Sequence, residues 1–476
     1  MIMVFSQGIS RFARWPPLKL RLSDRTPLPM ATSSRFTHPL DILRQIATDL
    51  LRQAAAQGAS ACEVDVSEGY GQTAVVRKGE VETIEYNRDK SIGVTAYLGQ
   101  RKGFASTSDF SPNALTDTVA AAVSIARFTA SDDCAGLAEP EMMAREIHDL
   151  DLFHPWNLPI DEAIERARAC EAAAFALDPR IVNSEGTGVS TQQHQFVVAN
   201  SNGFAAGYPT TRHYLSCAVI AAQNGAMQRD DWYAEARSAR DLPAGEAVGR
   251  YAGQRALARL KSRKLKTMKV PVLFEAPMAG GLISGFVSAV SGGSLYRKTS
   301  FLLDSLGKQV FSPLVQLAER PHQKKGLASC YFDDDGVATH ARDVVKDGVL
   351  QGYFLGTYSA RKLGMKSTGN AGGSHNLIVR SGDLDLPGLL KKMGRGLFVT
   401  DLMGQGINMV TGDYSRGAAG YWVEGGQIQY PVEEITIAGN LRDMFKGIVA
   451  IGNDELTRGS RRCGSILIDR MTIAGN

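Results

Sequence analysis

Three segments of the sequence combine residue types that could bind a ligand or do chemistry. The first is Asp333-Asp334-Asp335-Gly336, whose clustered carboxylates suit hard cations such as Ca²⁺ and Mg²⁺. This segment lacks the ligand spacing of an EF-hand loop and precedes an apparent strand. A polar turn is therefore favoured over a metal site.

The second segment is the densest polar loop of the chain, at residues 367–376 (STGNAGGSHN). Its small hydroxyl side chains and glycines would let backbone N–H groups approach an anion or an extended peptide closely. The third segment is Gly-rich and follows a predicted strand, and it comprises residues 404–406 (GQG) and 411–417 (TGDYSRG). Both segments could equally be glycine turns between β elements, and residue types alone leave the two interpretations open.

Standard catalytic signatures are missing from the sequence. It contains no G-x-S-x-G, no P-loop and no G-x-G-x-x-G after a strand. None of the 8 histidines stands next to a glutamate or four residues from another histidine. This excludes a zinc site built from two histidines on adjacent turns of one helix.

The elements that must position these segments follow from hydrophobic periodicity. A period near 3.6 predicts helices at residues 39–57, 111–127, 161–177 and 244–260. Alternation predicts two strands around the turn at 77–80, and further short strands at 91–98, 102–106, 195–199, 203–207 and 214–222. From residue 270 onward, turn-punctuated β structure dominates, with strands at 270–274, 397–400 and 435–437, hairpin turns at 346–348 and 424–426, and short helices at 386–393 and 440–445.

These elements predict an α+β fold with a β-rich C-terminal domain. The expected divisions are a disordered or wrongly assigned extension at 1–30, domains of helices and short strands at 37–130 and 150–262, and the C-terminal domain at 269–476. The order helix, strands, helix occurs twice, although residue identity is too low to establish a duplication. The basic run at 261–269 is a solvated linker in the favoured interpretation and a phosphate-binding patch in the other.

Length, charge and composition limit the classes of protein to which the chain can belong. The chain of 476 residues is about three times the usual length of one domain. Residues 1–30 account for the whole formal charge of +4, so the rest of the chain is neutral, which argues against a nucleic-acid binder. No apolar run approaches the roughly 20 residues needed to span a bilayer. The six scattered cysteines suggest reduced thiols in the cytoplasm, and residues 1–29 are expected to be a disordered tail or a start-site error preceding Met30.

The order of residues in the later segments of the sequence resembles the TldD/PmbA family of bacterial peptidase subunits. The resemblance is carried by residues 367–376 (STGNAGGSHN), 410–420 (VTGDYSRGAAG), 429–445 (QYPVEEITIAGNLRDMF), 451–454 (IGND) and 462–465 (RCGS). Residues 77–82 (RKGEVE), 91–94 (SIGV) and 103–106 (GFAS) are similar to the family too. Many consecutive positions agree in order and spacing, from about residue 40 to the end.

The resemblance implies two kinds of subunit that pair. The TldD-like kind binds zinc through an H-E-x-x-x-H helix and a distant cysteine, and the PmbA-like kind, also called TldE, lacks the histidines. In this sequence Phe274 and Ala279 stand where the histidines are expected, while Glu275 and Cys463 remain. Zinc needs three protein ligands in a catalytic site, so no metal is expected on this chain and Glu275 and Cys463 are expected to be vestigial. Glu275 is expected to be a hydrogen-bonded group near a helix start, and Cys463 a half-buried thiol.

The function that the resemblance implies is that of a PmbA-like subunit. It would join a zinc-bearing TldD-like partner in a cytoplasmic metalloprotease that degrades or processes unfolded or extended peptides, including leader segments and an antitoxin. Two loops are expected to line the peptide chamber, through Ser367, Thr368, Gly369, Asn370, Gly372, Gly373, His375, Asp413, Tyr414, Ser415 and Arg416. Strand addition would satisfy the backbone of such a substrate without reading its sequence.

Two other functions stay open. The chain could be an independently active metallopeptidase that uses Cys463 with His322 or His340, or a non-enzymatic protein-binding regulator, since the family has also been named as a modulator of DNA gyrase. A homodimer is a further expectation when the partner is absent, because unpaired interface surface would otherwise be exposed. No nucleic acid and no membrane are expected as partners.

Overall fold

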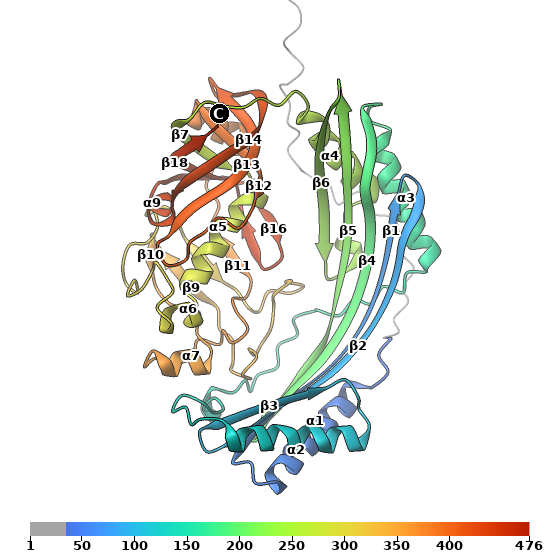
Figure 1. Cartoon of the computed structure of the whole chain (residues 1–476), viewed down its shortest axis with the longest axis vertical. Helices are drawn as coiled ribbons and strands as arrows, with labels where there is room; N and C mark the ends of the chain where they lie inside the picture. Colours follow the sequence, from blue (N-terminus) through green and yellow to red (C-terminus); the bar gives the residue numbers. More distant parts are fainter. Residues whose placement is uncertain (1–34, 476) are drawn as a thin grey trace, which may run out of the picture.

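A long curved sheet and a compact β-rich body make up the molecule (Figure 1). The computed structural model describes residues 35–475, and the extension predicted at residues 1–30 lies outside them. The long strands arc along one side, and the elements after residue 268 lie on the other. The predicted α+β fold with a β-rich C-terminal part is confirmed.

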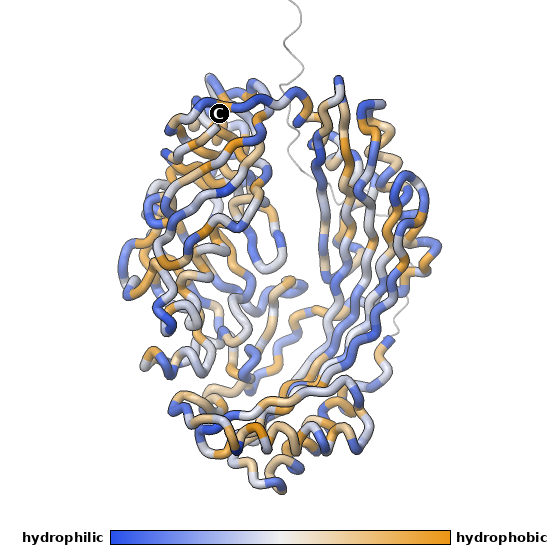
Figure 2. Tube along the Cα trace, viewed as in Figure 1, coloured by the Kyte–Doolittle hydropathy of each residue, from blue (hydrophilic) through white to orange (hydrophobic). Residues whose placement is uncertain are grey.

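The long sheet has the strand order β3-β2-β1-β4-β5-β6, and every neighbouring pair is antiparallel. Its strands are β1 (Ala61–Arg77), β2 (Glu80–Leu98), β3 (Arg101–Thr107), β4 (Ile181–Asn200), β5 (Ala205–Gln223) and β6 (Ala226–Ala236). Burial alternates along β1 and β4, as expected for strands with one covered face. Figure 2 shows hydrophilic and hydrophobic stretches alternating along these strands.

Two helix pairs cover the sheet, one pair toward each end of the long strands (Figure 1). The first pair is α1 (Leu40–Ala56) and α2 (Pro112–Phe128), which pack on the sheet around Leu43, Val64 and Val123. The second pair is α3 (Ile160–Phe175) and α4 (Gly245–Ala258), which pack around Cys170, Val219 and Ala252. The sheet therefore has two separate hydrophobic cores, each under its own helices.

The predicted helices lie within a few residues of these positions, whereas the strands are much longer than predicted. The short strands expected at 195–199 and 203–207 are parts of β4 and β5, and β6 was not expected at all. The reason is that the long strands bury polar side chains. Gln72 donates to the Leu158 carbonyl (3.0 Å), and Gln195 donates to the His38 carbonyl (2.7 Å). Such interior hydrogen bonds break the hydrophobic pattern from which strands are predicted.

The repeated order of helix, strands and helix is visible in the fold. The unit from α1 to α2 and the unit from α3 to α4 share one sheet, because β1 pairs with β4 from Glu63↔Asn200 to Val76↔Thr187. An irregular segment joins the two units and holds only the short 3₁₀ turn η1 (Pro140–Met142); a second turn, η2 (Ala239–Asp241), precedes α4. The segment packs Met143 and Leu152 against Phe204 and Phe332, which ties the sheet to the C-terminal body.

The C-terminal body contains two further sheets. The first has the order β14-β13-β12-β7-β18-β15, and an additional pairing of β14 with β18 closes five of its strands into a ring. Its strands are β7 (Met268–Phe274), β12 (Gly396–Met403), β13 (Asp413–Glu424), β14 (Gln427–Asn440), β15 (Ile448–Ile451) and β18 (Ile466–Ala474). The second has the order β10-β9-β8-β11-β17-β16, with β8 (Leu317–Glu319), β9 (Arg342–Lys346), β10 (Val349–Leu350), β11 (Leu377–Val379), β16 (Leu456–Arg458) and β17 (Arg461–Cys463).

Helix α5 (Ala276–Ala289) belongs to the core that the two C-terminal sheets share. Its Ile283 and Phe286 are fully buried, and Phe286 meets Phe311 edge-on with ring centroids 4.9 Å apart. The shorter helices α6 (Gly292–Tyr296), α7 (Thr357–Lys362), α8 (Leu386–Met393) and α9 (Leu441–Lys446) lie between strands. Within residues 35–475, no helix is long and apolar enough to cross a membrane.

Candidate functional site

The position predicted for vestigial zinc ligands lies where β7 ends and α5 begins. Phe274 is the last residue of β7, Glu275 directly precedes α5, and Ala279 lies in its first turn. Phe274 and Ala279 are fully buried in the C-terminal core. Their hydrocarbon side chains carry no lone pair for a metal.

The carboxylate of Glu275 is occupied by an arginine from another part of the chain. Arg255 of α4 donates from Nη1 to both carboxylate oxygens of Glu275 (2.8 and 3.1 Å). Its Nε donates to Asp230 of β6 (2.9 Å), and its Nη2 donates to the carbonyl of Thr400 in β12 (3.2 Å). One guanidinium thus sits between two carboxylates and links the long sheet to the C-terminal body.

The Asp230–Arg255–Glu275 cluster is buried, since all three residues expose less than a tenth of their surface. Burial raises the pKa of the Glu275 carboxyl, and the Arg255 guanidinium opposes that rise. The guanidinium also lies over the rings of Trp232 and Tyr251, 5.3 and 5.9 Å from their centroids. A cation already fills the place next to Glu275 and hydrogen-bonds to both of its carboxylate oxygens.

Cys463 is equally unsuited to hold zinc. It is buried in β17, its Sγ donates to the Gly464 carbonyl (3.1 Å), and burial raises the pKa of its thiol, with Asp454 and Glu455 adding to the rise. A zinc ligand must be a thiolate, so zinc would have to displace the proton that burial and the neighbouring acids hold on this thiol. No group of three or more His, Cys, Asp and Glu side chains that could hold a metal exists within residues 35–475. The residues present therefore do not fit zinc.

The loop at residues 367–376 is anchored inward by Glu319 of β8. One oxygen of Glu319 accepts from the Asn370 side chain (2.9 Å) and from the His375 backbone (2.8 Å). The other oxygen pairs with Arg342 (2.7 Å), which also donates to the Asn370 amide oxygen (3.0 Å). Thr368 donates to the same amide oxygen (2.7 Å). Asn370 is thus committed to holding the loop.

Other residues of this loop divide between interior and surface. The Ser367 hydroxyl donates to the Leu355 carbonyl (3.1 Å), and the Gly369 carbonyl meets His375 Nε2 (2.8 Å). Gly372 and Gly373 are exposed and have positive φ values of 85° and 125°, where other residues would be strained. A peptide could therefore contact this loop at its two exposed glycines, and its substrate role stays a prediction.

A cysteine–histidine pair beside this loop was not anticipated from the sequence, because Cys330 and His375 are 45 residues apart. Cys330 Sγ lies 3.0 Å from His375 Nδ1, and the other ring nitrogen faces the Gly369 carbonyl. Burial raises the pKa of the Cys330 thiol, and Asp333 and Asp334 add to the rise. Because a nucleophilic cysteine needs a lowered pKa, the raised pKa of Cys330 favours a buried hydrogen bond over a catalytic dyad.

The acidic segment at Asp333–Gly336 is a turn that caps this region. Asp333 accepts from the backbone of Asp335 (3.0 Å), Val337 (2.9 Å) and Ala371 (2.9 Å). Burial and the neighbouring Asp335 raise the pKa of Asp333 to about 8. Its oxygens are used by backbone donors, which favours the turn over a cation site.

The second candidate loop lies in the other C-terminal sheet, at the start of β13. Asp413 is exposed and accepts from Thr411 (2.6 Å) and Asn440 (3.1 Å), which lowers its pKa. Tyr414 is buried, Ser415 is exposed, and Arg416 donates to the Leu402 carbonyl (3.3 Å). No hydrogen bond or ion pair of residues 35–475 joins this loop to residues 367–376, which lie beside a different sheet, and the substrate role of this loop stays a prediction.

Family models match most of the chain. Residues 62–126, 153–260 and 267–475 match the first, central and C-terminal domains of the PmbA/TldA metallopeptidases. The chain is 50% identical to the metalloprotease PmbA of Escherichia coli O157:H7, over 94% of this chain and 99% of that protein. It is 24% identical to a metalloprotease TldD homologue of Haemophilus influenzae, over 84% of this chain and 90% of that protein.

Solved structures show the same fold. A Bacteroides thetaiotaomicron protein described as a candidate modulator of DNA gyrase superposes with a TM-score of 0.87 at 28% identity, covering 92% of this chain and 99% of that one. TldE from Thermococcus kodakarensis superposes with a TM-score of 0.80 at 19% identity, covering 90% and 100%. With three domain matches in order and half of its residues shared with a relative of nearly equal length, the chain belongs to the PmbA/TldD family of metallopeptidases.

Proposed function

We propose that this chain is the PmbA-type subunit of a two-subunit metallopeptidase in the cytoplasm, and that a TldD-like partner carries the zinc. The observation that carries the proposal is the buried Asp230–Arg255–Glu275 cluster, in which a guanidinium takes the place of a metal next to Glu275. Phe274 and Ala279 supply no ligand, and the Cys463 thiol is protonated. The peptide bond would therefore be hydrolysed at the partner's metal.

What this chain contributes in the proposal is shape and β structure. Its sheets offer backbone groups to an extended peptide, and strand addition suits an unfolded substrate because it uses main-chain hydrogen bonds. Residues of this chain bind and orient the peptide, while the partner supplies the water-activating metal. The relatives named as metalloproteases support the chemistry, and the TldD homologue supports the existence of the second kind of subunit.

The test is reconstitution. The full chain is purified, mixed with a TldD-like chain from the same genome that bears the H-E-x-x-x-H motif, and followed for loss of an unstructured fluorogenic peptide. Each chain is also assayed alone. We expect peptide loss in the mixture at a rate at least tenfold above the sum of the separate chains. Loss by this chain alone would make it an independent peptidase, and a stable complex without cleavage would make it a regulator.

A variant separates a structural Glu275 from a catalytic one. Glu275→Gln keeps an oxygen that accepts from Arg255 but cannot act as a general base. We expect the mixture with this variant to cleave peptide within about twofold of the original. A loss of roughly a hundredfold in a folded Glu275→Gln variant would return catalysis to this chain.

A further inference from the structure

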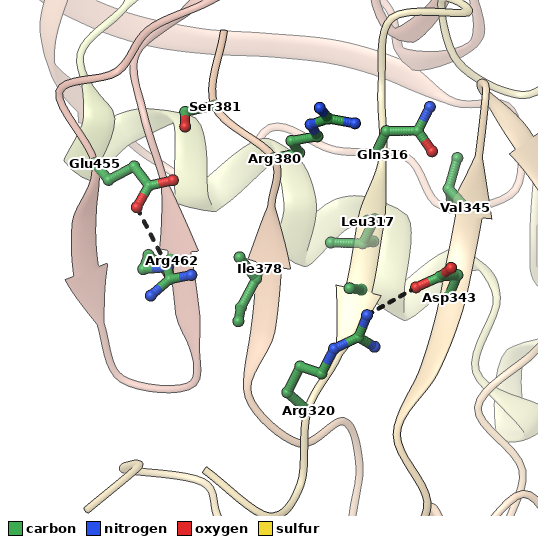
Figure 3. A pocket seen from close by; sticks show the side chains of 11 residues that line it. Gln316, Leu317, Arg320, Asp343, Val345, Ile378, Arg380, Ser381, Glu455 and Arg462 are labelled. Carbon is green, nitrogen blue, oxygen red and sulfur yellow. Dashed lines mark hydrogen bonds and ion pairs between the residues drawn. The ribbon is translucent and has the colours of Figure 1, made fainter. Parts of the chain in front are cut away.

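A pocket of about 290 Å³ lies where the long sheet meets the C-terminal body. Its walls come from the end of β6, from the segment 323–327 and from the hairpin of β16 and β17. A second pocket of about 420 Å³ adjoins it and shares Ile378 and Arg462 with it (Figure 3). Strands β11 and β17, which carry these two residues, thus contribute to both pockets.

A row of residues across five strands lines one or the other pocket. Neighbouring strands place Asp343 opposite Ala318, Ala318 opposite Ile378, Ile378 opposite Arg462, and Arg462 opposite Thr457. At about 4.8 Å between strands, the row is roughly 19 Å long, the length of about six extended residues. The row is thus about as long as a short extended peptide.

Cations outnumber acids around the smaller pocket. Its lining includes the cations Arg237, Lys324, Lys325, Arg461 and Arg462, and the acids Glu235 and Asp241.

Most of these charges already have partners. Glu235 pairs with Arg212 and accepts from the Gly459 backbone (2.6 Å), and Asp241 pairs with Lys325 (3.1 Å). Lys324 pairs with Asp149 (3.5 Å), and Arg462 pairs with Glu455 (3.4 Å; Figure 3). Among the described residues, no ion pair joins Arg237 or Arg461 to a carboxylate.

Arg237 is held in place by carbonyl groups. It donates to the carbonyls of Thr211 (3.0 Å), Gly326 (3.3 Å) and Leu327 (2.6 Å). Burial lowers its pKa to about 10, which still leaves the guanidinium charged near neutral pH. It is a fixed positive charge at the pocket wall, and Glu235 acts on it through space without a direct ion pair among the described residues.

Arg461 has an unused donor. Its Nε is buried and meets no acceptor among the described residues, and burial lowers its pKa. The neighbouring Arg458 packs over the rings of Tyr233 (3.8 Å) and Trp232 (4.5 Å), which fixes the hairpin against the long sheet. A buried N–H without an acceptor is costly, and a carboxylate in the pocket would satisfy it with a charge-assisted hydrogen bond.

We propose that this pocket binds a carboxylate group of an extended peptide, with Arg461 as the principal cation. The carboxylate chemistry rests on the pocket alone, whereas the choice of a peptide rests on the proposed function. The group is either the C-terminal carboxylate of the peptide or an acidic side chain. The two sources have the same chemistry and are separated by the test.

The test measures binding of unlabelled, N-acetylated hexapeptides to the full chain by isothermal titration calorimetry, without any partner protein. Three peptides share one uncharged sequence: a free C-terminus, an amidated C-terminus, and an amidated C-terminus with one central aspartate. We expect the amidated, acid-free peptide to bind at least tenfold more weakly than one or both of the others. Whichever carboxylate restores binding identifies the source.

Arg461→Met should weaken binding of the carboxylate peptide by roughly 10- to 100-fold, the cost of one charge-assisted hydrogen bond to a buried cation. Arg470→Met, which removes an exposed arginine of β18 outside the pocket, is the matched control and should leave affinity unchanged. Thermal melting of both variants checks their folding. Equal affinity for all three peptides, or full affinity in a folded Arg461→Met variant, would overturn the proposal.

The outcome is independent of the reconstitution assay. Carboxylate-dependent binding together with an inactive mixture would uphold this site and reject the two-subunit peptidase. Cleavage by the mixture together with carboxylate-independent binding would do the reverse.

Discussion

At the scale of single residues, the sequence exposes what is missing at the candidate metal position but not what replaces it. Phe274, Glu275 and Ala279 lie close together in the sequence, so they can be compared with a sequence motif. Arg255 cannot be recognised in this way, because its acceptors Asp230 and Glu275 lie 25 and 20 residues away on different elements. Only the fold brings the guanidinium to the carboxylate. The same holds for Cys330 and His375.

Within the buried cluster, Arg255 is the residue whose substitution should lower the free energy of unfolding most. Arg255→Leu would leave the Glu275 carboxylate buried without a cation and Asp230 with only Arg259, 3.6 Å away, and we expect the free energy of unfolding to fall by about 3–5 kcal/mol. Chemical denaturation monitored by circular dichroism measures the loss. Arg250→Leu, an exposed arginine on the same helix, is the control and should change stability by less than about 0.5 kcal/mol.

A second variant checks the cause. Adding Glu275→Gln to Arg255→Leu removes the orphaned charge of Glu275, so the double variant should regain part of the lost stability. If the double variant is less stable than Arg255→Leu alone, burial of unpaired charge is not the reason for the loss.

At the scale of elements, helices were predictable and strand lengths were not. A helix repeats its buried face every 3.6 residues, and α8 begins and ends where its periodicity predicted. The long strands instead bury Gln72, Thr191, Gln193 and Gln195, whose hydrogen bonds depend on neighbours far away in the chain. Strand β6 was not predicted because its sequence is polar; its Asp230 contacts Arg255 and does not face solvent.

Helix α4 holds Arg255 in position through close packing on α3. A Cβ at Gly249 would lie 1.8 Å from the Cys170 carbonyl oxygen, a backbone atom that cannot move aside cheaply. We expect Gly249→Ala to lower the free energy of unfolding by about 1–3 kcal/mol, since overpacking forces the helices apart. Thermal unfolding of the folded variant measures this cost.

Gly280→Ala in α5 is the matched control for that substitution. A Cβ there would meet nothing within 4 Å, so the helix propensity of alanine should dominate and stability should rise by up to about 1 kcal/mol. Equal effects of the two substitutions would contradict the packing argument.

At the scale of the whole molecule, acidic side chains meet where the long sheet faces the C-terminal body. Glu63 of β1 has its pKa raised to about 7 by burial, with further contributions from Asp335, Asp65 and Asp334 that outweigh the opposing Lys102. The sequence could not predict this contact, because β1 and the turn at Asp333 are far apart in the chain. The division into domains at residues 37–130, 150–262 and 269–476 stays a prediction.

This contact predicts that stability falls with rising pH. The folded pKa of Glu63 (about 7) exceeds the ordinary 4.5, so the folded state binds the extra proton and loses stability between about pH 4.5 and 7. Asp333, raised from 3.8 to about 8, acts in the same direction over a wider range. We expect the melting temperature to be higher at pH 5 than at pH 8.5.

The side chain of the Glu63→Gln variant cannot ionise. We expect this variant to reduce the difference between the melting temperatures at pH 5 and pH 8.5 by about 2–4 °C, the shift typical of about 1 kcal/mol in a large domain. The exposed Glu85→Gln on β2 is the control and should leave the difference unchanged. An unaltered pH dependence in Glu63→Gln would show that Glu63 does not titrate as described.

The central claim is that this member of the PmbA/TldD family holds no catalytic zinc, because Arg255 occupies Glu275 and the remaining positions offer a protonated thiol and two hydrocarbon side chains. The most direct test is the amount of zinc bound per chain, measured by elemental analysis of full-length protein purified without chelator from zinc-supplied cells. The account predicts a value near zero that Cys463→Ser leaves unchanged. A value near one zinc per chain, lost in a folded Cys463→Ser variant, would contradict it.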